Sequence, residues 1–187
     1  MRDELLVAVD EILERTGDPA QVSVRGVAGA VGVAPNAVYL HFADRDTLLA
    51  EVAIRHFEDC AAAVRAAAAA HAEPLEALYA GCDTYCRLAL ERPGHYRLLF
   101  HGLVRPADPA VATRLAEAAW GYFQTCIDGC QAAIDAGALA PTDVRQLAAA
   151  MWAVEHGWCE IRLTGDLGKG LLPTARDTLS ALLNARA

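Results

Sequence analysis

Six cysteines offer the most evident chemistry in this sequence, and four of them are spaced in pairs. Cys82 precedes Cys86 by four residues, and Cys126 precedes Cys130 by the same interval. Residues four apart share a helix face, so two such pairs brought together could bind a soft metal through thiolates or form an oxidation switch. However, the pairs lack the short loop spacing of structural zinc sites, and buried cysteine is a common small hydrophobe. We therefore keep thiol or metal sensing through these cysteines only as an alternative to the main functional prediction, which is developed below.

A second set of residues suits a pocket for a small molecule. Trp152 and His156 lie four apart and share a helix face, and an imidazole in an apolar wall can orient a ligand. Large apolar side chains with a few polar groups are typical of such sites, although the same residues would equally suit a plain core. The candidate ligand-binding residues are Tyr85, Tyr96, Trp120, Phe123, Ile127, Trp152 and His156.

The sequence contains no motif that indicates an enzyme. The segment Gly165–Gly170 lacks the four-residue gap before Gly-Lys, the following Ser or Thr and the preceding strand of a phosphate-binding loop, so we interpret it as a helix-helix link. A nucleophile elbow, a HExxH zinc motif and a dinucleotide fingerprint are also missing. We expect neither catalysis nor a cofactor.

Composition points to a helical protein of the cytoplasm. The 187 residues can form one compact domain or two small ones, and an apolar content of mainly Ala, Leu and Val favours helices over sheets. No run of about 18 apolar residues is present, and Met1–Glu4 lack the apolar stretch of a secretion signal. We therefore expect no membrane segment and reduced thiols.

The net charge of −8 excludes a protein that coats nucleic acid or anionic membranes through bulk electrostatics. Residues 1–45 contain four Arg against seven Asp and Glu, so this part is itself acidic. Any contact with DNA must therefore be local.

Apolar periodicity and chain breakers predict an all-α fold of about nine helices without a strand. Ser23 and Asp44 are suited to cap helices, Gly32 to end one, and Pro35 to begin one. The expected helices cover the residues before Gly17, Val24–Val31, Pro35 to about His41, Arg45 to about His71, a segment from Pro74 to about Glu91, His95–Leu103, a long helix that ends at Ala136, Thr142–Thr164, and a last helix that begins at Pro173.

The second and third of these helices satisfy the steric requirements of a helix-turn-helix. Ala28 lies four residues before Gly32, and apolar Val38 lies six after it. The small residue lets the helices approach, the glycine makes the turn, and the second helix is left free to enter a major groove. Many helical proteins contain two short helices and a glycine, so this spacing alone is only moderately specific.

The residues around this turn strengthen the interpretation. The stretches VSVRGVA at 22–28 and GVAPNAVYLHF at 32–42, followed by Arg45 and Leu48, resemble the TetR family of bacterial repressors. The match is dense over roughly residues 5–50, and Tyr39–Phe42 is its most specific part. The resemblance implies that residues 1–46 form a DNA-binding domain and that residues 47–187 form a ligand-binding and dimerisation domain.

The resemblance implies which residues contact DNA. Asn36 is best suited to read a base edge, because an amide offers both a donor and an acceptor. Tyr39, His41, Ser23 and Arg25 would bond phosphates, and Arg45 stands where the family usually has Lys. The predicted DNA-binding residues are Ser23, Arg25, Pro35, Asn36, Ala37, Tyr39, Leu40, His41 and Arg45.

The sequence departs from the family pattern at three positions of the motif. Gly26 and Gly29 each weaken the first helix by about 1 kcal/mol relative to Ala, and Ala34 replaces the usual hydroxyl cap of the second. We expect specific, modest and salt-sensitive DNA binding.

In the second half, Trp152–Gly157 is similar to the Trp-x-x-x-His-Gly signature of one subgroup of the family. The resemblance implies a homodimeric repressor that leaves a palindromic operator when a small apolar or aromatic ligand moves the long helix from Arg45 to about His71. The last two helices, Thr142–Thr164 and Pro173–Arg186, would form the dimer, unless their leucines belong to an internal core. These leucines are Leu171, Leu172, Leu179, Leu182 and Leu183.

Overall fold

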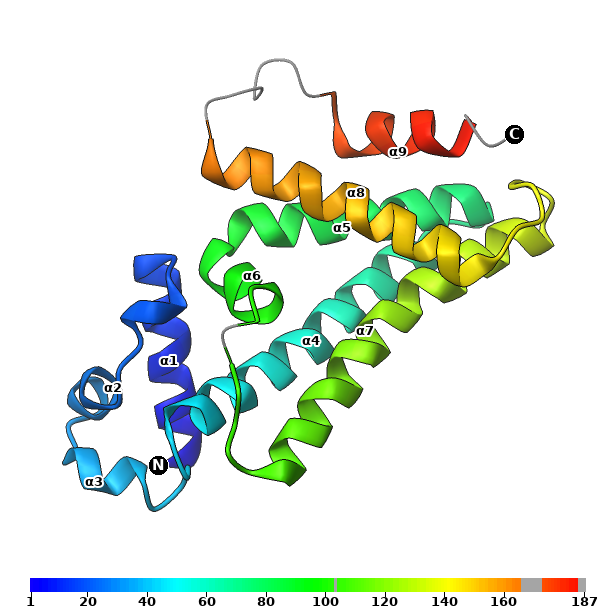
Figure 1. Ribbon diagram of the computed structural model, residues 1–187. Helices are drawn as coiled ribbons and strands as arrows, with labels where there is room; N and C mark the ends of the chain where they lie inside the picture. The colour runs from blue at the N-terminus through cyan, green and yellow to red at the C-terminus, as the bar shows by residue number, and fades with distance from the viewer. Residues whose placement is uncertain (103, 166–172, 185–187) are drawn as a thin grey trace. The chain divides into compact units, whose positions relative to one another are not determined.

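A computed structural model describes residues 1–102, 104–165 and 173–184 of this chain (Figure 1). The described residues contain nine α-helices and no strand, so the predicted all-α class is confirmed. The helices are α1 Arg2–Thr16, α2 Val24–Val31, α3 Pro35–Val38, α4 Arg45–Ala69, α5 Pro74–Glu91, α6 Pro93–Phe100, α7 Pro109–Asp135, α8 Val144–Thr164 and α9 Ala175–Asn184, with a 3₁₀ turn η1 at Pro19–Gln21.

Most predicted boundaries hold, and the exceptions have local causes. Helix α6 begins at Pro93, because a proline at the first helical position loses no hydrogen bond, and it ends at Phe100. Asp143 caps α8 by accepting hydrogen bonds from the backbone N–H groups of Arg145 and Gln146. The α-helical part of α3 stops at Val38, and turns continue to His41.

The described residues form two compact units. The first unit comprises Met1–Asp59 and Arg92–Trp120, and the second comprises Cys60–Glu91 and Gly121–Ala187. The chain passes between them three times: inside α4, between α5 and α6, and inside α7. Among the described residues, no helix combines the length and the apolar character needed to span a bilayer.

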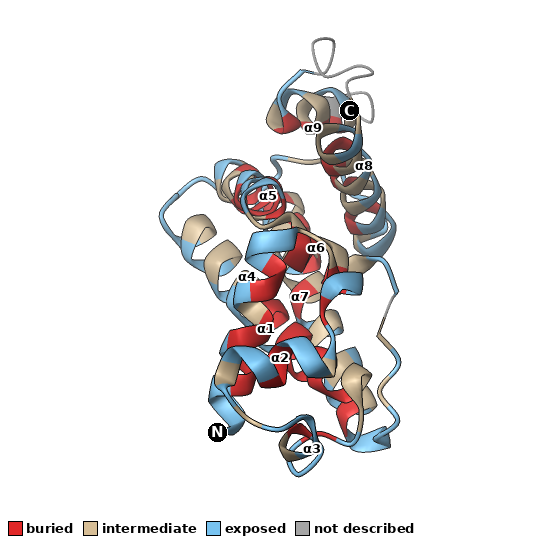
Figure 2. Cartoon of the chain, turned by 90° about the vertical axis from the view of Figure 1, so that its left-hand side faces the viewer, coloured by how far each residue is buried: buried red, intermediate tan, exposed pale blue. Residues whose placement is uncertain are grey.

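The core of the first unit is built on one face of α1. Leu5, Val9 and Leu13 are fully buried, and the buried face of this helix is red in Figure 2. Val27 of α2 and Leu48 of α4 belong to the same cluster. Apolar residues at intervals of three and four along α1 therefore hold the shorter helices in place.

Helix α6 lies directly against the C-terminal part of α1. A Cβ atom at Gly94 would lie 2.4 Å from the backbone oxygen of Leu13, so only glycine permits this approach. Arg97 donates to the carbonyl oxygen of Gly17, and Arg92 pairs with Glu14. These polar contacts flank the glycine and fix the position of α6 along α1.

The second unit has its own core between α5, α7, α8 and α9. Leu147, Met151 and Leu179 are fully buried in it, and Leu183 is 5% exposed. Leu179 and Leu183 therefore belong to an internal core of the chain, which was the second of the two roles considered for these leucines. Leu182 is half-buried against the same cluster, whereas Leu171 and Leu172 lie outside the described residues, as does most of the Gly165–Gly170 link.

Substitution of Gly94 by Ala should destabilise the protein, because its methyl group cannot fit beside Leu13. We expect a loss of about 2 kcal/mol, or about 4–8 °C in the midpoint of thermal unfolding. Gly29→Ala is the matched control, since nothing lies within 4 Å of its added Cβ, and alanine favours the helix. An equal loss in both variants would show that the close approach is unimportant.

Candidate functional site

The turn between α2 and α3 is built by specific local hydrogen bonds. Ser23 Oγ accepts from the backbone N–H of Gly26 at 3.1 Å, which confirms its predicted role as the cap of α2. Gly32 ends α2 with φ of 76°, a left-handed conformation that favours glycine, and Val33 N–H donates to the Ala28 oxygen at 2.9 Å. The chain therefore reverses sharply into α3.

One buried side chain anchors α3 and leaves its other side chains on the surface. Val38 is 1% exposed and belongs to the core of the first unit, whereas Tyr39 is 53% and Leu40 is 82% exposed. Tyr39 and Leu40 are therefore both accessible to a partner immediately after α3. Of the other predicted DNA-contacting residues, Ala37 is half-buried and the following are exposed: Ser23, Arg25, Pro35, Asn36 and His41.

Arg45 is directed into the protein in this structure. Its guanidinium donates to the carbonyl oxygens of Val22 and Pro19, each at 2.6 Å, and pairs with Asp46 at 3.2 Å. These bonds tie the start of α4 to the segment that leads into α2. A contact between Arg45 and phosphate would require them to rearrange.

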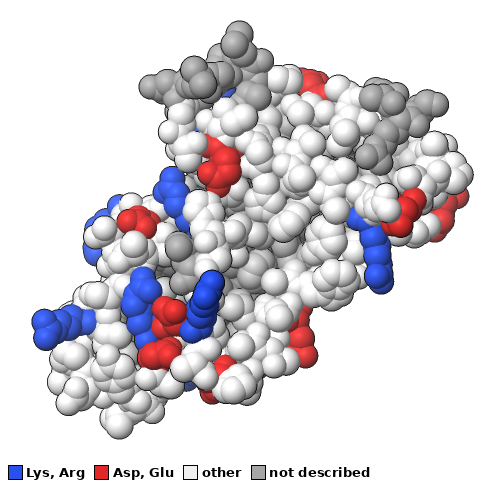
Figure 3. Space-filling model, in the orientation of Figure 1, with Lys and Arg blue, Asp and Glu red and all other residues white. Residues whose placement is uncertain are grey.

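The acidic residues of the N-terminal part lie outside the helix-turn-helix. No Asp or Glu occurs between Asp18 and Asp44, and Arg25 is the one residue of Lys or Arg type in that interval. Asp18 and Asp44 accept backbone hydrogen bonds at the starts of η1 and α4. In Figure 3 the extreme lower left tip of the view, where α3 lies, is white, and the red acidic residues lie above it and to its right. The overall negative charge thus does not extend to α2 and α3.

A small cavity lies within the second unit. Its volume is about 50 Å³, and its wall is contributed by α4, α5, α7 and α8. A Cβ at Gly81 would meet Val64 at 3.2 Å, and one at Gly129 would meet Leu78 at 3.0 Å, so two glycines allow the helices to approach around it. The cavity is lined by Val64, Ala68, Ala77, Leu78, Gly81, Cys82, Tyr85, Tyr122, Phe123, Thr125, Cys126, Gly129, Trp152 and Glu155.

Three of the predicted ligand-binding residues line this cavity, namely Tyr85, Phe123 and Trp152. His156 is not part of the lining, but a ring nitrogen lies 3.0 Å from the Tyr85 hydroxyl and its ring contacts Trp152. It therefore positions two residues of the wall. Of the others, Ile127 is buried in the core of the second unit, whereas Tyr96 and Trp120 belong to the first unit, Tyr96 being buried and Trp120 51% exposed.

A buried carboxyl group in this cavity was missed by the sequence analysis. Glu155 is 4% exposed, and its Oε1 is buried without a hydrogen-bond partner in the described part of the chain. Burial raises the pKa of Glu155 to about 8, despite a hydrogen bond from the Cys82 thiol that acts in the opposite direction. The group is therefore mostly a neutral acid at pH 7. Its position three residues after Trp152, on the same helix face, was the available signal.

The paired cysteines lie in the interior of the second unit. Burial is the main cause that raises the pKa of Cys82, and for Cys86 a hydrogen bond with Cys159 acts together with burial. A hydrogen bond with Cys130 and burial raise the pKa of Cys126. Protonated thiols are poor nucleophiles and poor metal ligands. These surroundings disfavour the thiol- or metal-responsive alternative.

A larger hollow of about 460 Å³ lies in the first unit, with Phe57, Leu98 and Leu115 in its wall. Its lining contains no buried polar side chain that could orient a ligand. The cavity around Glu155 is therefore the better candidate site.

Solved structures share the fold of this chain. A protein of unknown function from Rhodococcus sp. RHA1 is 24% identical, with 98% of this chain and 92% of that chain covered and a TM-score of 0.80. The regulator FadR from Bacillus subtilis, in complex with stearoyl-CoA, is 16% identical with 98% of both chains covered and a TM-score of 0.77. RolR in complex with resorcinol is 15% identical, with 100% of this chain and 87% of that chain covered and a TM-score of 0.70.

The fold and its exposed helix-turn-helix define a ligand-responsive transcriptional regulator. A family model described as the tetracyclin repressor-like C-terminal domain matches residues 78–185. The chain belongs to the TetR family. Members of this family bind DNA and small molecules, act as dimers and are generally not enzymes. A search of curated proteins found no match.

The neutral carboxyl of Glu155 should make stability depend on pH. Because its pKa is about 8 in the folded state against 4.5 for an ordinary Glu, the folded protein binds more protons between these values, and the free energy of unfolding falls as pH rises from about 5 to 8. Glu155→Gln should remove most of this fall. The measurement is urea unfolding at several pH values, with Glu58→Gln as the exposed control. The idea fails if the two variants show the same slope.

Proposed function

We propose that this protein is a repressor that binds a palindromic operator as a homodimer and leaves it when a small apolar or aromatic ligand binds. Residues 1–46 would hold the DNA-binding domain, and residues 47–187 the ligand-binding and dimerisation domain. The proposal depends above all on α3, which Val38 anchors while Asn36, Tyr39 and Leu40 remain exposed.

The surface of the helix-turn-helix suits a DNA groove. It carries an amide at Asn36 and hydroxyl or ring donors at Ser23, Tyr39 and His41, and no carboxylate that would repel phosphate. With Arg25 as its single cation of Lys or Arg type, binding would depend more on shape and hydrogen bonds than on charge. We therefore expect specific and modest affinity.

The cavity in the second unit supports a small ligand with a hydrogen-bonding group. Aromatic side chains supply apolar contact, and neutral Glu155 can donate a hydrogen bond to a hydroxyl or carbonyl oxygen. The structural relatives are solved with resorcinol and with stearoyl-CoA. A hydroxylated aromatic such as resorcinol suits this cavity better than an acyl chain, because the cavity is small.

The size of the cavity also suggests how a ligand would act. About 50 Å³ is well below the roughly 150 Å³ of an engineered cavity that admits benzene, so an aromatic ring must push helices apart as it enters. Val64 and Ala68 of α4 are in the wall, and the start of α4 is tied to the segment before α2 by Arg45. Movement of α4 would change the separation of the two recognition helices in the dimer.

The exposed face of α8 supports a dimer. Ala149, Ala153, Gly157 and Ile161 are spaced by four and all exposed, so they form one row along the helix. Small residues in such a row allow a second helix to approach closely. We therefore propose this row as the dimer contact. Leu179 and Leu183 are buried within the chain itself and are not available for that role.

The DNA-binding role can be tested by selection from random duplex DNA. We expect a palindrome, bound with an affinity that falls at least about tenfold in Asn36→Ala because the base contact is lost. In Arg25→Gln, the dependence of affinity on salt should weaken by about one unit of slope, as expected for loss of one phosphate contact.

Gln146→Ala serves as the control, because it removes an exposed amide of α8 outside the helix-turn-helix. Its affinity should equal that of the unchanged protein. Absence of any enriched sequence would contradict DNA reading, and an unaltered affinity in Asn36→Ala would remove this residue from the interface.

The ligand-binding role can be tested with resorcinol as the probe. We expect resorcinol to raise the midpoint of thermal unfolding and to release the selected duplex. Ala77→Leu should prevent both effects by filling the cavity, whereas Ala62→Leu, at an exposed position of α4, should not. Tighter DNA binding with resorcinol, or equal responses of the two variants, would refute this mechanism.

A further inference from the structure

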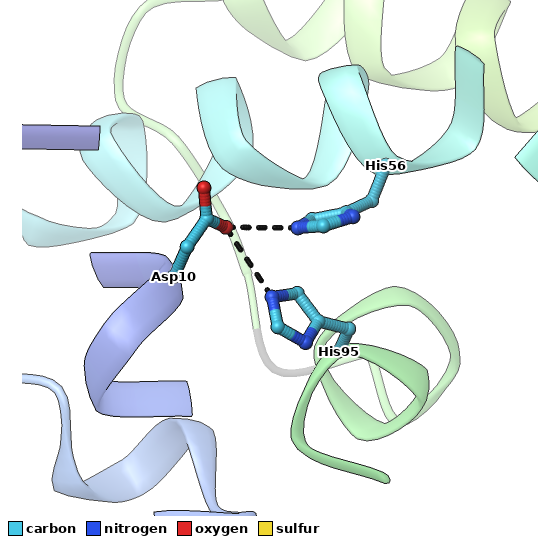
Figure 4. Close-up of side chains that lie close together, drawn as sticks. All are labelled: Asp10, His56 and His95. Carbon is cyan, nitrogen blue, oxygen red and sulfur yellow. Dashed lines mark hydrogen bonds and ion pairs between the residues drawn. The ribbon is translucent and has the colours of Figure 1, made fainter. Parts of the chain in front are cut away.

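Three side chains that can ligate a metal meet in the first unit. Asp10 on α1, His56 on α4 and His95 on α6 point toward one another (Figure 4). Asp10 Oδ1 lies 2.8 Å from His56 Nε2 and 3.2 Å from His95 Nε2. The three potential ligand atoms all lie within 4.8 Å of one another. None of these residues belongs to the helix-turn-helix or lines the cavity.

The surrounding fold holds these side chains in place. Gly94 brings α6 against Leu13 of α1, so the adjacent His95 is set beside Asp10. The two histidines are almost fully buried, with 7% of His56 and 3% of His95 exposed, and their ring centroids are 4.0 Å apart. The Asp10 side chain is 21% exposed, so the group is most open to solvent on the side of Asp10. An ion can therefore enter on that side.

The spacing of the three atoms suits a transition-metal ion. Bonds of about 2.1 Å in tetrahedral geometry place ligand atoms about 3.4 Å apart, so small shifts of the side chains would bring all three to coordination distance. Two imidazoles and one carboxylate are the ligands that zinc and neighbouring first-row metals accept, with a fourth position open to water. We propose that Asp10, His56 and His95 form a binding site for a divalent transition-metal ion of the zinc type.

The free nitrogen of His95 permits the necessary tautomer. A metal on Nε2 requires the proton of a neutral ring to lie on Nδ1. The Nδ1 atom of His95 is buried and has no hydrogen-bond partner in the described part of the chain, so no donor there forces the proton to stay on Nε2. Metal binding would move that proton to Nδ1 and place the ion where the Asp10 hydrogen bond now lies.

The ion would join three helices of the first unit. Helix α1 carries the core under α2, so a bond from Asp10 to α4 and α6 would restrict the support of the helix-turn-helix. This role is independent of the proposed organic ligand and of the cysteines. An ion that binds the folded state alone also raises its stability in proportion to its occupancy.

The test uses the full chain, freed of any affinity tag and stripped of metal with EDTA. Titration with Co²⁺ is followed by visible absorption, and titration with Zn²⁺ by calorimetry and thermal unfolding. We expect one ion per chain, a cobalt spectrum without a thiolate charge-transfer band, and a rise of about 5 °C or more in the unfolding midpoint at saturating Zn²⁺. A thiolate band would assign the metal to the cysteines and overturn the proposal.

Variants locate the ligands. His56→Gln, His95→Gln and Asp10→Asn should each weaken Co²⁺ binding by at least about tenfold, whereas His71→Gln, at an exposed position, should leave it unchanged. Far-UV circular dichroism in EDTA establishes that each variant is folded, and Asp10→Asn preserves the size of the side chain should a histidine variant unfold. No saturable binding by the unchanged protein, or equal binding by folded cluster variants, would refute the site.

Discussion

The contact of α6 with α1 at Gly94 constrains much of the first unit. The helices are so close that a methyl group would collide with the backbone of Leu13, and Arg92 and Arg97 secure the contact on either side. Because the backbones of the two helices are in contact, the position of α6 along α1 is fixed as well as the distance between the helices. The position of His95 beside α1 follows from it, and α1 in turn shares its core with α2 and α3.

The second unit follows a different physical principle. Its core places a carboxyl group and several thiols in an apolar interior, where burial keeps them protonated. A neutral acid can remain there at modest cost, and Oε1 of Glu155 has no hydrogen-bond partner among the residues that the structure describes. The core of the first unit thus holds α3 in place, whereas the core of the second unit contains the cavity in which a ligand is proposed to bind.

The sequence predicted those features that depend on neighbouring residues. Ser23, Gly32 and Asp44 act as helix caps and stops where their types indicated, because each bonds within three or four positions. Tyr96 and Trp120 belong to the first unit and Tyr85 to the second, so their place in a common wall stays a prediction, since helical spacing gives the face of a residue but not its unit. The Asp10, His56 and His95 group could not be found at all. Its hydrogen bonds span 46 and 85 positions, so only the packing of α1, α4 and α6 brings it together.

The uneven distribution of charge has a consequence for the search for DNA. All 24 carboxylates lie outside residues 19–43, so the rest of the chain repels a duplex while this segment does not. This net charge would disfavour other orientations of approach, and sliding along unrelated sequence would be brief because few phosphates would be neutralised. Such a protein would dissociate rapidly from random DNA. A larger fraction of it would then be free in solution to find its operator and to bind its ligand.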